Sequence, residues 1–273
     1  MEQRPKKLLE QVQDVIRLKH YSRSTGQSYA HWIKRFILFH HKRHPKEMGA
    51  PEIEAFLTHL AVKENVAAST QNQALSALLF LYRDVLKQDI EFAQTAVRAQ
   101  KPKLLPTVLT KAEAQTVLGL THGTHQLMAK LLYGCGLRLM ECVQLRVKDI
   151  DFAQHLIVVR DGKGQQDRVT VLPDSLVMPL QEHLRRRKKS YEADVAKGAG
   201  YVYLPFALER KYPHAHREWI WQYVFASAQL TKNPDTGLMQ RWYMSETTLQ
   251  RAVKVAAARA GLDKRVSCHT FRH

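Results

Sequence analysis

The fold is decided by residues 127–172, which read LMAKLLYGCGLRLMECVQLRVKDIDFAQHLIVVRDGKGQQDRVTVL. The first seven residues have helical spacing, Gly134 and Gly136 interrupt it, and a helix is expected to resume over 138–145. The period then changes to short segments rich in Val and Ile, separated by turn residues. These segments are 147–151, 155–160 and 167–172. They predict a small antiparallel sheet beside helices.

Upstream of this stretch, the first hundred residues have the pattern of amphipathic helices separated by short breaks. Residues 98–107 contain two prolines, three basic residues and no periodicity, which is typical of an interdomain linker. We therefore expect a helical domain over 1–97 and a second domain over 108–273. The expected fold class is mainly α with a small antiparallel sheet, the second domain being mixed α+β.

Composition and charge narrow the classes of function that the chain can have. The chain has 273 residues, 45% hydrophobic and 25% charged, which fits a two-domain globular protein. Its formal charge of +17 predicts binding to a polyanion, most simply nucleic acid, with an anionic membrane surface or a merely solvated face as alternatives. No apolar run is long enough to span a membrane. We expect a soluble, cytoplasmic protein.

Cysteines and histidines give no sign of a metal site. Cys135, Cys142 and Cys268 are odd in number and form no CxxC pair. The histidine-rich stretches 40–44 and 214–216 lack carboxylates or thiolates at ligand spacing. We expect neither a disulfide framework nor a metal or other cofactor.

Four residues have the chemistry needed to break a phosphodiester without a metal: Arg138, Lys163, His269 and Arg272. Two guanidiniums can bind the phosphate oxygens as their charge increases in the transition state. An ammonium on a hairpin tip can protonate the leaving oxygen, and a histidine can assist at the phosphate or the nucleophile. Each residue alone also has an ordinary structural explanation, such as pairing of Arg138 with Glu141. Their order and intervals together favour catalysis.

The motifs that carry these residues resemble the tyrosine recombinases. They are residues 134–141 (GCGLRLME), 145–151 (LRVKDID), 162–164 (GKG) and 269–273 (HTFRH). Residues 19–38 and 221–225 (WQYVF) are most similar to the integron integrases within that family. The resemblance covers nearly the whole chain.

The resemblance implies a core-binding domain and a catalytic domain that close on DNA as a C-shaped clamp. In this family a tyrosine attacks the phosphate and forms a 3′-phosphotyrosyl bond, and full-length members assemble as tetrameric synapses. Arg138 and Arg272 would clamp the phosphate, Lys163 would protonate the leaving group, His269 would assist, and Glu141 would orient Arg138.

DNA is the expected partner, both as a double-stranded attachment site and as a folded single-stranded cassette site. Integron integrases carry an insert that helps to recognise extrahelical bases, expected here within about 191–243. Most aromatic residues of this insert could equally belong to the core. The candidate DNA-contacting residues are Arg23, Lys34, Arg35, Tyr212, Trp219, Trp242 and Tyr243.

Two departures from the family pattern bear on activity. No tyrosine follows Arg272 in the printed sequence, so we expect a chain cut short before the nucleophile and inactive alone. Residues 241–245 (RWYMS) replace a histidine-rich stretch usual in integron integrases. A non-catalytic DNA-binding remnant that occupies recombination sites or interferes with intact protomers is the alternative. A basic protein that binds RNA or anionic lipid is a third hypothesis.

Overall fold

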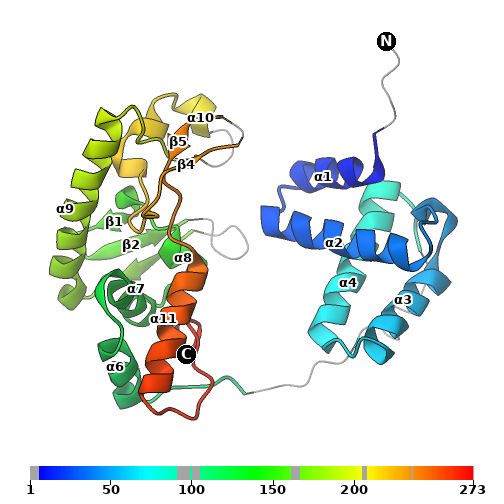
Figure 1. Cartoon of the computed structure of the whole chain (residues 1–273), viewed down its shortest axis with the longest axis horizontal. Helices are drawn as coiled ribbons and strands as arrows, with labels where there is room; N and C mark the ends of the chain where they lie inside the picture. Colours follow the sequence, from blue (N-terminus) through cyan, green and yellow to red (C-terminus); the bar gives the residue numbers. More distant parts are fainter. Residues whose placement is uncertain are drawn as a thin grey trace. The chain divides into compact units, whose positions relative to one another are not determined.

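The computed structural model describes residues 6–90, 99, 105–160, 167–204, 208–234 and 236–272. The chain divides into two compact units, Met1–Leu104 and Leu105–His273 (Figure 1). Each unit has a hydrophobic core of its own. Lys163, His273 and most of the expected linker lie outside the described residues.

The first unit is helical, as the sequence predicts. Its helices are α1 (Leu8–Leu18), α2 (Arg23–Phe39), the 3₁₀ helix η1 (Pro45–Glu47), α3 (Ala50–Val62), α4 (Ala68–Phe80) and the π-helical turn η2 (Leu81–Leu86). Helix α2 begins where the Ser22 hydroxyl accepts a hydrogen bond from the backbone N–H of Thr25 (3.1 Å). In the core, the Phe36 ring lies 5.6 Å from that of Phe56 and 6.4 Å from that of Tyr82. Edge-on aromatic packing therefore joins α2, α3 and η2.

A buried carboxylate ties the two ends of this unit together. Asp84 in η2 accepts from the Lys19 ammonium at the end of α1 (2.5 Å) and lies 3.4 Å from the Arg83 guanidinium. Burial opposes the charged form of Asp84, but its hydrogen bonds to Lys19 and Arg83 outweigh burial, so the pKa of Asp84 lies below its ordinary value.

Replacing this carboxylate, as in Asp84→Asn, is expected to destabilise the first unit by about 1–2 kcal/mol at neutral pH, since Lys19 is partly solvated. Because the pKa of Asp84 is lower in the folded than in the unfolded state, the stabilisation is fully present above the pKa of the unfolded state, near pH 4. It is lost as the pH falls through the lower pKa of the folded state. Urea unfolding of wild type and variant at several pH values should show curves that converge in acid. A difference that is unchanged at low pH would contradict this assignment.

The second unit combines helices with two small antiparallel sheets, which confirms the expected fold class. Its helices are α6 (Lys111–Gly119), α7 (Gly123–Gly134), α8 (Leu139–Val143), α9 (Asp174–Ala196), α10 (Leu208–Lys211) and α11 (Glu246–Arg259). Its 3₁₀ turns are η3 (Val147–Asp149), η4 (Ala215–Arg217), η5 (Trp219–Trp221) and η6 (Thr270–Arg272). Its strands are β1 (Ile150–Asp151), β2 (Leu156–Val159), β3 (Arg168–Val171), β4 (Thr231–Lys232) and β5 (Met239–Gln240).

The main sheet has the order β1-β2-β3, with Ile157 paired to Ile150 on one side and to Thr170 on the other. Its first strand is shorter than the sequence predicts. Residues 147–149 form the turn η3 instead, because the Asp149 carboxylate accepts from the backbone N–H of Arg146 (3.2 Å) and closes it. The expected helix over 138–145 is likewise only the five residues of α8.

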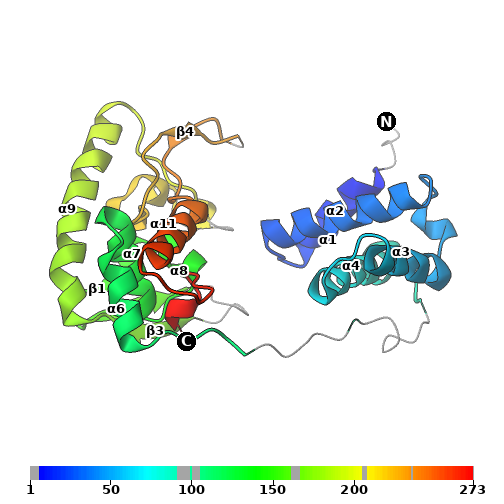
Figure 2. The ribbon, with the colours of Figure 1, turned by 60° about the horizontal axis from the view of Figure 1, so that its bottom comes forward.

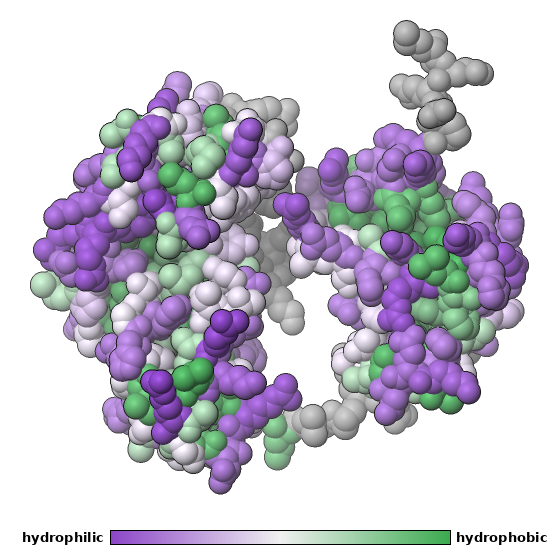
Figure 3. All heavy atoms as spheres, in the orientation of Figure 1, coloured by the Kyte–Doolittle hydropathy of each residue, from purple (hydrophilic) through white to green (hydrophobic). Residues whose placement is uncertain are grey.

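Helix α7 lies at the centre of this unit and packs against α9 on one side and α11 on the other. Figures 1 and 2 show α9 running along the outer side of the unit, with α8 and α11 on the opposite side of α7. The outer side of α9 is mostly hydrophilic (Figure 3). Most of its basic run is exposed there, including Arg185 and Arg186, but Arg187 is buried with 9% of its surface exposed.

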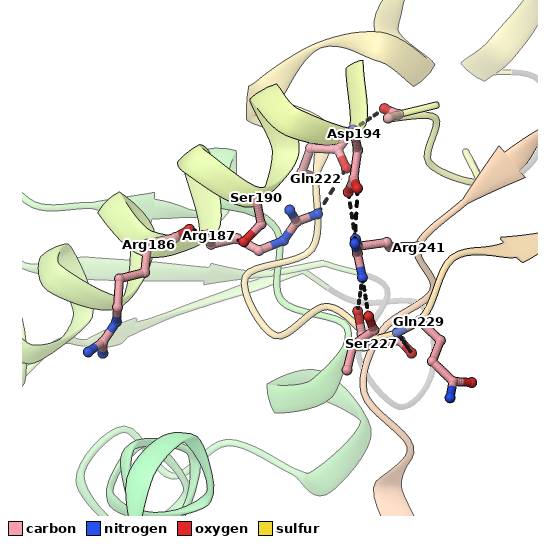
Figure 4. Close-up of polar contacts among 10 residues, drawn as sticks. Arg186, Arg187, Ser190, Asp194, Gln222, Ser227, Gln229 and Arg241 are labelled. Atoms are coloured by element: carbon pink, nitrogen blue, oxygen red, sulfur yellow. Dashed lines mark hydrogen bonds and ion pairs between the residues drawn. The ribbon is translucent and has the colours of Figure 1, made fainter. Parts of the chain in front are cut away.

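A buried polar cluster joins α9 to the segment after it (Figure 4). The Arg241 guanidinium donates to both carboxylate oxygens of Asp194 (2.5 and 2.9 Å) and to the carbonyl of Ser227 (3.1 Å). Arg187 donates to the side-chain oxygen of Gln222 (3.3 Å), while its Nε and Nη1 have no acceptor among the described residues. Burial, together with Arg241, lowers the pKa of Arg187 to about 10. Asp194 therefore pairs with the half-buried Arg241, and its negative charge also favours the ionised form of the buried Arg187.

Candidate active site

Arg138 stands at the start of α8, after a loop whose conformation favours glycine. Gly136 has a φ of +60°, in the left-handed region that side chains rarely adopt. The Glu141 carboxylate then accepts from the backbone N–H of Arg138 (2.8 Å) and from its Nη1 (2.6 Å). The Arg138 side chain is 34% exposed and that of Glu141 only 9%. The structure therefore pairs Glu141 with Arg138, and the orienting role of Glu141 stays a prediction.

A second arginine shares the same carboxylate. Arg168, the first residue of β3, donates from Nη2 to the Glu141 carboxylate (2.5 Å) and is 31% exposed. Burial opposes ionisation of Glu141, but the hydrogen bonds from Arg138 and the charges of both arginines outweigh it and hold its pKa below the ordinary value. Sequence reasoning missed Arg168. Its only signal was an arginine placed in a Val-rich strand.

The segment after α11 brings His269 to the neighbourhood of α8. Cys268, Thr270 and Phe271 are buried in the unit, whereas His269 and Arg272 are exposed. The backbone N–H of Arg272 donates to the carbonyl of His269 (3.1 Å), so one helical turn separates the two side chains.

A cavity of about 270 Å³ lies between this turn, α11 and the first residue of α8. Its lining residues are Leu139, Gln250, Lys254, Val266, Ser267, Cys268 and His269. Since Leu139 directly follows Arg138, His269 lies close to the start of α8. That Arg138 and Arg272 meet on one phosphate stays a prediction.

Lys163 belongs to residues 161–166, which lie between β2 and β3 and outside the described part of the chain. Two arginines near the ends of this segment each reach a buried carboxylate. Arg160 donates from Nε to Asp149 (2.9 Å) on one side, and Arg168 donates to Glu141 on the other. Both ends of the segment are therefore fixed to the body of the unit.

The aromatic residues of the expected insert divide into two groups. Trp219 and Tyr243 pack against the hydrophobic core, next to the rings of Tyr191 and Tyr223 respectively. Residues 191–196 of the range expected for the insert belong to α9, and the insert itself stays a prediction.

The remaining two candidates lie nearer the surface. Trp242 stacks on Tyr203 with ring centroids 5.6 Å apart, and Tyr203 is an exposed residue that the sequence analysis did not single out. Tyr212 is exposed, and its ring centroid lies 6.3 Å from that of Trp221. Lys148 also contacts Trp221, with its ammonium 3.7 Å from the ring centroid, and burial lowers the pKa of this lysine.

In the first unit, the three basic candidates differ in their environment. Arg35 forms a double ion pair with Glu64 (2.5 and 2.6 Å) and lies over the Trp32 ring at 4.9 Å. Arg23 and Lys34 are exposed on the same helix. Arg35 therefore has a structural role, and Arg23 and Lys34 are better placed to meet a polyanion.

Among the described residues, no three His, Cys, Asp or Glu side chains form a cluster that could hold a metal ion. The three cysteines are buried thiols, and burial raises the pKa of Cys135 to about 12. Within the same described ranges, no helix has the length and apolar character needed to cross a membrane.

Comparison with known proteins identifies the family. Residues 8–91 match the phage integrase N-terminal SAM-like domain, and residues 107–273 match the phage integrase family. The chain belongs to the phage integrase family. It is 46% identical over 267 residues to an integrase/recombinase of Escherichia coli, an alignment that covers 98% of this chain and 79% of that protein. It is 29% identical over 188 residues to the tyrosine recombinase XerA of Thermococcus onnurineus, which covers 68% of this chain and 64% of that one.

Solved structures of other integrases share the fold of this phage integrase family member. The integrase of transposon Tn1549, in complex with transposon right end DNA, superposes with a TM-score of 0.63 at 15% identity, covering 98% of this chain and 84% of that one. A lambda integrase dimer bound to a core site superposes with a TM-score of 0.60 at 17% identity, covering 97% of this chain and 82% of that one. These likenesses confirm the tyrosine recombinase fold.

Proposed function

We propose that the chain acts as a site-specific DNA recombinase, breaking and joining strands by metal-free phosphoryl transfer through a 3′-phosphotyrosyl intermediate. The observation that carries this proposal is the Arg138 guanidinium, one third exposed and held by a buried carboxylate in a member of the phage integrase family. A guanidinium fixed in this way remains charged and directs its other N–H groups at an incoming phosphate.

The proposed roles follow from the chemistry of each side chain. Arg138 and Arg272 bind the non-bridging oxygens and stabilise their growing negative charge. His269, one turn before Arg272, assists at the phosphate or at the proton of the nucleophile. Lys163 is proposed from its GKG motif to protonate the leaving 5′-oxygen. The attacking tyrosine is proposed from the family, and no residue between 6 and 272 is assigned to that role.

We assign DNA binding to both parts of the chain, with residues 1–97 as a core-binding domain and 108–273 as a catalytic domain joined by 98–107. The more specific proposal is an integron integrase that integrates and excises gene cassettes. Its support is the insert, where Trp242 and Tyr212 offer ring surface to an extrahelical base. Double-stranded attachment sites, folded single-stranded sites and a tetrameric synapse are the partners this reading implies.

The test begins by selecting bound DNA from two random-sequence pools, one of 30-bp duplexes and one of folded single strands. Each phosphate of the selected duplex is then replaced in turn by an uncharged methylphosphonate. We expect a sequence preference, affinity that falls with salt, and one position where the replacement weakens binding about tenfold. Enrichment of strands with an extrahelical base would support the integron reading.

The proposal would be contradicted by binding without sequence preference, or by a flat profile across all phosphates. Uniform, salt-sensitive binding of both pools would point instead to a general polyanion-binding protein. Selection from the duplex pool alone, with no preference for extrahelical bases, would retain the recombinase and remove the cassette specificity.

A further inference from the structure

Strand β3 contacts the loop before α8 through alternate side chains. Arg168 and Thr170 point to the same side of the strand, as residues two apart in a strand must. The Thr170 hydroxyl donates to the carbonyl of Cys135 (2.8 Å), and Arg168 Nη2 lies 3.5 Å from the carbonyl of Gly136. The strand is therefore attached to the loop that positions Arg138.

The same side of β3 determines how Glu141 is shared. One carboxylate oxygen of Glu141 accepts from Arg138 Nη1, and the other accepts from both the backbone N–H of Arg138 and Arg168 Nη2. Both oxygens are thus occupied, and among the residues that the structure describes the Arg138 side chain is bound at a single nitrogen. Two guanidiniums around one carboxylate leave a net charge of +1 at this site.

We propose that Arg168 is a positioning residue, which acts through Glu141 to keep Arg138 turned towards the phosphate. This inference rests on the proposed function. Without Arg168, the second oxygen of Glu141 keeps the backbone N–H of Arg138 but gains room to accept from the Arg138 guanidinium as well. A two-point arginine–carboxylate pair then forms readily. Such a pair would occupy two nitrogens of Arg138 and turn its guanidinium away from DNA.

The geometry also explains why an arginine is needed here. Nη2 of Arg168 donates to Glu141 and faces the carbonyl of Gly136. The planar guanidinium holds this nitrogen in a fixed direction, whereas a lysine ammonium is a compact charge on a flexible stem. A lysine at 168 would keep the charge but hold the carboxylate less firmly.

A double-mutant cycle on the selected duplex separates positioning from direct DNA contact. Arg168→Gln is expected to weaken binding about tenfold, and Arg138→Gln about thirtyfold. Because Arg168 acts through Arg138, the double variant should bind no more than about twofold more weakly than Arg138→Gln alone. The penalty for the sensitive methylphosphonate should shrink in Arg168→Gln as it does in Arg138→Gln, which a general loss of stability would not produce.

Arg160→Gln is the matched control, since Arg160 flanks the same segment, loses the same charge and pairs with Asp149 rather than Glu141. The loss of affinity in Arg160→Gln should add, as a free energy, to that of Arg138→Gln in the double variant. Arg168→Lys, which is less prone to unfold, should fall between wild type and Arg168→Gln.

Three results would overturn the inference: full additivity of Arg168→Gln with Arg138→Gln, an unchanged affinity in Arg168→Gln, or equal behaviour of Arg168→Lys and wild type. Failure of the proposed function is distinguishable, because wild type would then select no duplex or Arg138→Gln would bind it normally.

Discussion

Replacing Arg138 with glutamine is expected to weaken binding of the selected duplex by about thirtyfold while leaving the fold intact. One charge-assisted contact to a phosphate is worth about 2 kcal/mol, which corresponds to this loss. The side chain is one third exposed and contributes little to the core, so the thermal midpoint should move by no more than a few degrees. Filter binding and thermal unfolding of the same preparations measure the two effects.

The matched control is Arg185→Gln on α9. Arg185 also pairs with a glutamate three residues away, Glu182 (3.1 Å), and its replacement removes the same charge from the same unit. Because it lies in an exposed ion pair on the outer helix, we expect less than a threefold change in affinity. Equal losses in the two variants would mean that total charge, and not a specific phosphate site, determines binding.

Replacing Asp194 with asparagine should produce the largest loss of stability, about 3 kcal/mol for the second unit. The change leaves the half-buried Arg241 guanidinium without its carboxylate and removes the nearby negative charge from the buried Arg187 (Figure 4). For a unit of this size the loss corresponds to a fall in midpoint of about 6–12 °C. Calorimetry should resolve it as a shift of one transition.

Asp174→Asn serves as its control, because Asp174 is an exposed aspartate at the start of the same helix and pairs with His155 on the surface. We expect it to stay within about 0.5 kcal/mol of wild type. If Asp194→Asn is equally mild, the buried guanidiniums must find water or other acceptors, and the cluster is not what attaches the segment to α9.

Sequence patterns predicted the elements whose signals are local. The capping pair at the start of α6 has such a local signal, because Glu113 follows Thr110 by three residues. Glu113 accepts from the backbone of Thr110 (2.7 Å), and Thr110 accepts from that of Glu113 (3.2 Å). The small sheet was predicted from its period, and Glu141 was correctly matched to Arg138 because three residues separate them. Such interactions depend on spacing alone.

Contacts between distant segments could not be predicted in this way. Arg168 reaches Glu141 from 27 residues away, and Arg241 reaches Asp194 from 47. The sequence also could not divide the aromatic residues between core and surface, and Trp219, a candidate for DNA contact, packs partly buried against the core. Only the folded arrangement decides which aromatic or basic side chain faces solvent.

The buried guanidinium of Arg187 has a consequence for how salt titrations of this protein should be interpreted. The slope of log affinity against log salt counts the ions released from DNA, and only cations that reach a phosphate release them. Arg187 lies inside the protein, while Arg35 and Arg241 are occupied by carboxylates. The slope will therefore report fewer released ions than the 42 lysines and arginines of the chain would suggest.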